Sequence, residues 1–81
     1  MNVRVQFYAQ LRELIGVHDL ELEVPQGATV RELLEKIYAQ QPVLRAHDKS
    51  ILIGAGVEFV DRNHKLNPGD EISIMPPVQG G

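Results

Sequence analysis

The two glycines that close the 81-residue sequence, Gly80 and Gly81, have the clearest potential for chemistry. Glycine has no side chain, so a nucleophile can approach the terminal carboxylate of Gly81 from any direction, and the preceding backbone can thread a narrow channel. A free carboxylate is a poor electrophile, because resonance and its negative charge both repel a nucleophile. Adenylation by ATP would convert it into a mixed anhydride, which a sulfur donor or an amine can attack. We therefore expect another protein to activate this terminus.

The segment 76–81 is expected to be a flexible arm that carries the carboxylate into a partner's active site. Pro76 and Pro77 restrict the backbone at the base of the arm, which lowers the entropy lost on insertion. The arm follows an alternating apolar run, Glu71 to Met75, which predicts that a strand leads directly into it. The remaining residues of the arm are Val78, Gln79, Gly80 and Gly81.

Other residues capable of chemistry match no catalytic or ligand motif. Gly54-Ala55-Gly56 lacks the third glycine of a dinucleotide-binding loop, and no phosphate-binding helix follows it. The three histidines lack the spacing of metal ligands, and the absence of cysteine excludes a thiolate nucleophile and a disulfide. We therefore expect no metal site, no cofactor bound by this chain and no self-contained catalytic centre. ATP would be used by the activating partner.

Length and charge indicate one small domain without a nucleic-acid or membrane partner. A chain of 81 residues is close to the lower limit for a single unstapled core. The net charge is −3 and the eight Lys and Arg residues are scattered, so no basic footprint for nucleic acid or anionic lipid is present. No apolar run approaches the ~20 residues of a membrane span. We expect a cytoplasmic protein with a domain over 1–75 and a tail over 76–81.

Hydrophobic periodicity predicts the elements of the first half of the chain. Period-two alternation predicts strands over 3–8 and 20–24, and helical spacing predicts a short helix over 9–15 that Gly16 ends. Thr29 and Glu32 form a capping box that starts the main helix. That helix should end near Gln41, because a proline follows. Its predicted apolar face consists of Val30, Leu33, Leu34, Ile37 and Tyr38.

In the second half, strands are predicted over 51–53 and 57–60, separated by a break at Gly54-Ala55-Gly56. The segment 43–50 is a polar connection without a predicted shape, and 67–70 has the proline and glycine of a type II turn. This order of elements predicts an α+β fold of the β-grasp type: a roll with a mixed sheet and one main helix on one face. Its first and last strands should be parallel neighbours at the centre.

The alternation of apolar and polar residues along the strands also predicts which face of the sheet is exposed to solvent. Tyr8 and Met75 break the polar pattern on the face away from the helix, and Phe59 is the expected third apolar residue there. An apolar cluster on an outer face usually marks a partner surface, so these residues are candidates for partner binding. The alternative is that they only cover the sheet edge or the short helix.

Three segments carry a resemblance to a known family: 5–16 (VQFYAQLRELIG), 67–71 (NPGDE) and 75–81 (MPPVQGG). Along its whole length the chain resembles the ubiquitin-like sulfur carriers of the MoaD/ThiS type, and most of all the small subunit of molybdopterin synthase. Two positions depart from the family pattern. Gly56 stands where many relatives have asparagine, and Gln79 is bulkier than the residue often found before the glycine pair.

The resemblance implies specific chemistry and partners. Gly81 would be adenylated by a ubiquitin-activating-type adenylyltransferase, converted to a thiocarboxylate and delivered into the large subunit of molybdopterin synthase, with a heterotetramer expected. The sulfur would pass to a pterin precursor and build the dithiolene of the molybdenum cofactor. Tyr8, Phe59 and Met75 fall where relatives present their apolar docking surface.

Two kinds of alternative stay open from the sequence. A carrier could instead deliver sulfur to thiazole or cysteine synthesis, or be joined to protein lysines; the Pro-Pro-Val approach to the glycines favours molybdopterin. A different class is a β-grasp binding module whose terminus does no chemistry.

Overall fold

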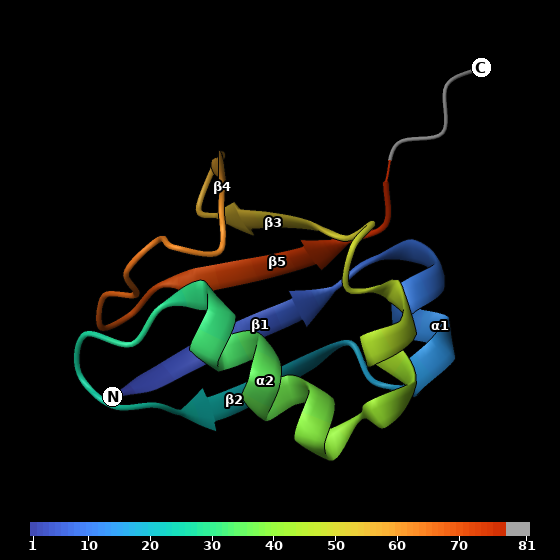
Figure 1. The fold of residues 1–81 in the computed structure, drawn as a ribbon, viewed down its shortest axis with the longest axis horizontal. Coiled ribbons are helices and arrows are strands. Elements are labelled where there is room, and N and C mark those ends of the chain that lie inside the picture. Colours follow the sequence, from blue (N-terminus) through green and yellow to red (C-terminus); the bar gives the residue numbers. More distant parts are fainter. Residues whose placement is uncertain (78–81) are drawn as a thin grey trace.

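The computed structural model describes residues 1–77, and five strands form one mixed sheet at its centre (Figure 1). Val78, Gln79, Gly80 and Gly81 lie outside the described residues, so only Pro76 and Pro77 represent the expected arm. In chain order the elements are β1 (Asn2–Phe7), α1 (Ala9–Ile15), β2 (Asp19–Glu23), α2 (Val30–Gln40), the 3₁₀-helix η1 (Pro42–His47), β3 (Leu52–Ala55), β4 (Glu58–Val60) and β5 (Glu71–Met75).

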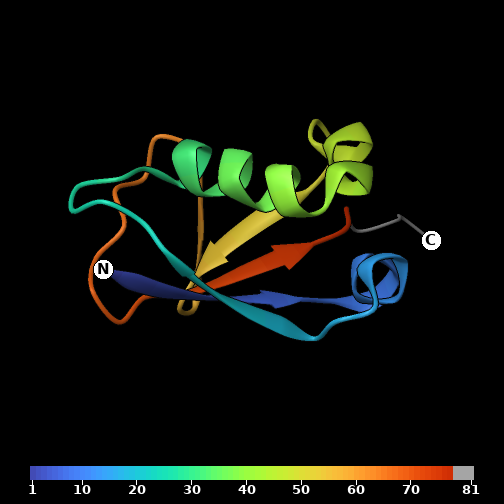
Figure 2. The ribbon, with the colours of Figure 1, turned by 90° about the horizontal axis from the view of Figure 1, so that it is seen from below.

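The strand order β2-β1-β5-β3-β4 confirms the predicted β-grasp fold. β1 and β5 are parallel, with Val5 opposite Ile72, and the other neighbouring pairs are antiparallel. The first and last strands of the chain thus lie side by side. Helix α2 crosses one face of the sheet, and the opposite face carries no helix along β1 and β5 (Figure 2). This open face is the one on which the candidate site lies.

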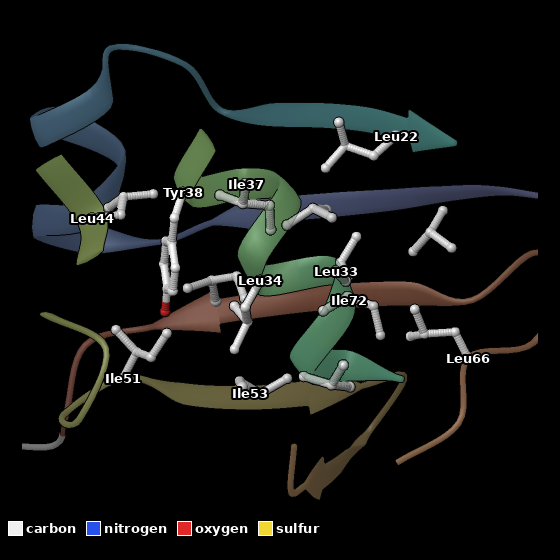
Figure 3. Packing of buried hydrophobic residues seen from close by; sticks show 14 of the residues in the cluster. Leu22, Leu33, Leu34, Ile37, Tyr38, Leu44, Ile51, Ile53, Leu66 and Ile72 are labelled. Carbon is white, nitrogen blue, oxygen red and sulfur yellow. The ribbon is translucent and has the colours of Figure 1, made fainter. Parts of the chain in front are cut away.

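The core lies between α2 and the sheet (Figure 3). Thr29 caps the helix as predicted. Its hydroxyl accepts a hydrogen bond from the backbone amide of Glu32, and the Glu32 carboxylate accepts one from the backbone amide of Thr29. Each large apolar side chain buried there contributes roughly 1.5–3 kcal/mol. The five predicted apolar positions of α2 are all buried: Val30, Leu33, Leu34, Ile37 and Tyr38.

One local prediction was wrong in detail. Gly54 and Ala55 do not break the chain, because they pair with Phe59 and Glu58 and extend β3 into a hairpin. The turn falls instead at Gly56, whose φ of 62° is left-handed, and at Val57. The connection over 43–50, for which the sequence predicted no shape, is largely the 3₁₀-helix η1, which buries Leu44 in the core.

The expected type II turn over 67–70 is present. Gly69 has φ 83°, and the Asp70 amide donates to the Asn67 carbonyl at 3.0 Å. This turn starts β5 in register with β1. Among residues 1–77, every helix is too short or too polar to cross a bilayer.

A polar network joins α2 to the segment after η1. The Tyr38 hydroxyl donates to the Asp48 carboxylate, and Arg62 donates to the Asp48 backbone carbonyl and, at 3.4 Å, to its carboxylate. The hydrogen bond from Tyr38 holds the pKa of Asp48 below its ordinary value of 3.8, and burial raises the pKa of Tyr38 above its ordinary 10.0. The network therefore fixes the end of η1 against the main helix.

Tyr38→Phe is expected to lower the free energy of unfolding by about 1 kcal/mol near neutral pH, because one hydrogen bond to a charged group is lost. In the wild type, Asp48 stabilises the fold above pH 3.8, and this contribution disappears as the pH falls below that value. Denaturant titrations at neutral and acidic pH should therefore show a smaller acid loss in the variant. Tyr8→Phe, which removes an exposed hydroxyl, is the matched control. An unchanged acid loss in Tyr38→Phe would contradict this role.

Candidate functional site

The three predicted partner-binding residues, Tyr8, Phe59 and Met75, meet at one hollow on the open face of the sheet. The hollow has a volume of about 190 Å³. Its other lining residues are Gly54, Gly56, Val57, Glu58 and Ser73. The alternation of the sequence therefore located residues that the fold brings together.

Parallel pairing of β1 with β5 brings Tyr8 and Met75 to the same end of the sheet. Tyr8 follows β1 directly and its amide donates to the Ile74 carbonyl at 3.1 Å, which continues the pairing by one residue. Phe59 reaches the hollow from β4, because it lies opposite Gly54 of β3. Three segments that are distant in sequence, the residue after β1, strand β4 and the end of β5, thus each contribute one apolar side chain.

The apolar side chains at the hollow are not needed to close the core. Phe59 is 72% exposed and Tyr8 is 42% exposed, whereas Met75 is half-buried. The Tyr8 hydroxyl donates to the Gln6 side chain at 2.8 Å, which orients the ring on the sheet. Exposed apolar groups gathered in a hollow are typical of a surface that another protein covers.

Sequence reasoning missed three features of this site. Gly54 forms part of its lining as a regular strand residue, and Val57 stands fully exposed at the tip of the β3–β4 hairpin. An apolar residue directly after a glycine turn was the available signal for Val57. Ala9 has φ 52°, in the left-handed region that costs a non-glycine residue of order 1–3 kcal/mol. That strain lets the chain turn from β1 into α1 immediately after Tyr8, and no sequence signal pointed to it.

The base of the expected arm lies directly beside the hollow. Pro76 and Pro77 follow Met75, the last residue of β5 and part of the hollow's lining. The two prolines also border a second hollow of about 410 Å³, formed with α1 and the η1–β3 connection. The last described residues, Pro76 and Pro77, therefore lie between two concave surfaces.

The open face is acidic along β1, β2 and the start of β5. Arg4 pairs with Asp19 at 2.9 Å, and this carboxylate raises the pKa of Arg4. Strand alternation places three further carboxylates on the same face, those of Glu21, Glu23 and Glu71. Four carboxylates against one guanidinium give an excess equal to the net charge of the whole chain, −3.

This arrangement supports the docking of another protein. Within residues 1–77, no three His, Asp or Glu side chains converge as a metal site, and every buried side-chain nitrogen or oxygen has a hydrogen-bond partner. The described part of the chain thus offers an apolar hollow, an acidic flank and, at Pro76 and Pro77, the base of the expected arm.

Comparison with known proteins gives the family. Residues 5–81 match the profile of the ThiS family. The molybdopterin synthase sulfur carrier subunit of Chlamydomonas reinhardtii is 35% identical over 83 residues, with both chains covered fully. The crystal structure of SAMP1 from Haloferax volcanii superposes with a TM-score of 0.89 at 25% identity, over 100% of each chain. A chain of the complex of subunits 1 and 2 of molybdopterin-converting factor from Helicobacter pylori superposes with a TM-score of 0.72 at 27% identity, also over 100% of each.

The β-grasp domain with an apolar hollow beside its last strand is thus that of a ubiquitin-like carrier, and the chain belongs to the ThiS family.

Proposed function

We propose that this chain is the sulfur-carrier subunit of a molybdopterin synthase. Its family and its full-length similarity to a carrier subunit of that name support this function. The structural observation that carries the proposal is the exit of the chain from β5 beside the apolar hollow. A partner that covers the hollow receives the terminus at the same time.

The chemistry centres on the carboxylate of Gly81. An adenylyltransferase of the ubiquitin-activating type joins this carboxylate to AMP from ATP and releases pyrophosphate. A donor that delivers sulfur at the sulfide level then attacks the acyl carbon of the mixed anhydride, expels AMP and leaves a thiocarboxylate. The large subunit receives the thiocarboxylate, its sulfur bonds to the pterin precursor, and water cleaves the acyl–sulfur bond and restores the Gly81 carboxylate. A dithiolene has two sulfur atoms, so each product molecule requires two such transfers. The carrier itself supplies no catalytic side chain.

The remaining roles divide between docking and insertion. Tyr8, Phe59 and Met75 hold the partner through the apolar hollow. Pro76 and Pro77 stiffen the base of the arm, so that less entropy is lost when the terminus enters the partner. The residues Val78, Gln79 and Gly80 then fill the channel to the active site.

The mass of the intact protein isolated from cells tests the proposal. A fraction of the protein should carry one sulfur in place of one oxygen, and fragmentation should place that change on Gly81. Deletion of the gene for the activating enzyme should remove this form. A protein that always has its unmodified mass, in cells that make molybdenum cofactor, would contradict the proposal. Conjugates to lysines of other proteins would instead indicate a protein modifier.

A further inference from the structure

Gly54 is unusual because it occupies an interior strand of the sheet and carries no side chain. β3 is paired with β5 on one side and β4 on the other, and Gly54 lies opposite Ser73 and Phe59. Glycine at such a position destabilises a fold relative to alanine, since it gains no packing and loses more backbone entropy. A glycine inside a strand often marks a place where another molecule approaches closely.

The domain itself has room for a larger residue at this position. A Cβ at Gly54 would lie 3.4 Å from Met75 Cε, 3.6 Å from the Glu58 carbonyl oxygen and 3.7 Å from Ser73 Cβ, all ordinary van der Waals contacts. The φ of Gly54 is not in the left-handed region, unlike that of Gly56 in the adjacent turn. Internal packing and backbone geometry therefore both permit alanine at this position.

The missing side chain leaves the floor of the apolar hollow open. Tyr8, Phe59 and Met75 stand around it, and the small residue Ser73 lies beside Gly54. A cavity of about 150 Å³ holds a benzene molecule. The 190 Å³ of the hollow can therefore receive one aromatic or large aliphatic side chain.

We propose that Gly54 determines docking specificity by keeping a socket open for one apolar side chain of the large subunit. This inference rests on the proposed function, which identifies that partner. Met75 lines the socket and Pro76 follows it, so a protein that holds the arm also covers the socket. The adjoining acidic part of the face would repel a second copy of this chain, and it complements basic residues around the inserted side chain.

The variants Gly54→Ala and Gly54→Val test the proposal by filling the socket. Alanine should raise the melting temperature, because it reduces the entropy of the unfolded chain. The Kd for the large subunit of the same organism, measured by calorimetry with the full chain, should rise about threefold for alanine and tenfold or more for valine. A residue with only a structural role would change stability and affinity in the same direction. Ala39→Val, on the exposed side of α2, adds volume away from the socket and should leave the Kd unchanged.

The outcomes separate this inference from the function on which it rests. Failure of the wild-type chain to bind the large subunit would overturn the proposed function. Tight binding by the wild type together with an equal or lower Kd for both Gly54 variants would overturn only the role of Gly54. If Gly54→Val does not fold, the Kd of Gly54→Ala alone tests the role of Gly54. Self-association of the wild type that Gly54→Ala abolishes would show that a second copy occupies the socket, and would also overturn the inference.

Discussion

Deletion of Gly81 is expected to abolish thiocarboxylate formation and to leave the melting temperature of the domain unchanged. The deletion moves the carboxylate back by one residue, about 3.5 Å of extended chain, while misplacement by about 1 Å can reduce a rate a hundredfold. Stability should persist because the buried core of the described residues ends at Ile74. The mass of the intact protein after incubation with ATP, the activating enzyme and a sulfur donor measures thiocarboxylate formation. A thermal melt of the same variant measures its stability.

An amide at the C-terminus provides the second arm of this experiment. It preserves chain length and removes the carboxylate, so it should fail as completely as the deletion. Lys49→Ala, an exposed substitution in the η1–β3 connection, is the control and should be converted at the wild-type rate. Conversion of the amidated chain would show that the reactive group lies elsewhere.

Phe59→Asp is expected to raise the Kd for the large subunit by about thirtyfold or more, the effect of losing an interface hot spot. The substitution replaces the exposed aromatic ring that β4 contributes to the hollow with a carboxylate, which would be desolvated on docking. The isolated domain should keep its melting temperature to within a few degrees, because the Phe59 side chain is 72% exposed. Calorimetric titration of the large subunit gives the Kd.

Val43→Asp is the matched control, since Val43 is also an exposed apolar residue but lies in η1, outside the hollow. Its Kd should equal that of the wild type. Equal losses of affinity for the two variants would mean that charge, and not the hollow, governs binding. An unchanged Kd for Phe59→Asp would remove Phe59 from the docking surface.

The parts of the fold that could be predicted are those governed by local patterns. Thr29 and Glu32 marked the start of α2, and period-two alternation assigned Val5 and Ile72 to the buried face of the sheet. The parallel pairing of the first and last strands followed from connection rules applied to the order of elements. Tyr8 and Met75 were identifiable because each places an apolar side chain where a polar one was expected.

The parts that could not be predicted depend on contacts between distant segments. η1 has little periodicity of its own, and Leu44 becomes buried only because the connection packs against α2. Asp48 and Arg62 are ordinary loop residues until the fold brings them to Tyr38. The sequence predicts that the strand is interrupted at Gly54, because glycine disfavours strands. In the structure, pairing with β4 on one side and β5 on the other keeps Gly54 in β3.

The most direct test of the carrier function is the transfer of sulfur itself. Carrier with an isotopically labelled sulfur on Gly81 is mixed with the large subunit and the pterin precursor under single-turnover conditions. Under the carrier function, the carrier returns to its carboxylate mass as the label appears in the dithiolene of the product. Product that forms without the label, or labelled carrier that persists while product accumulates, would contradict it.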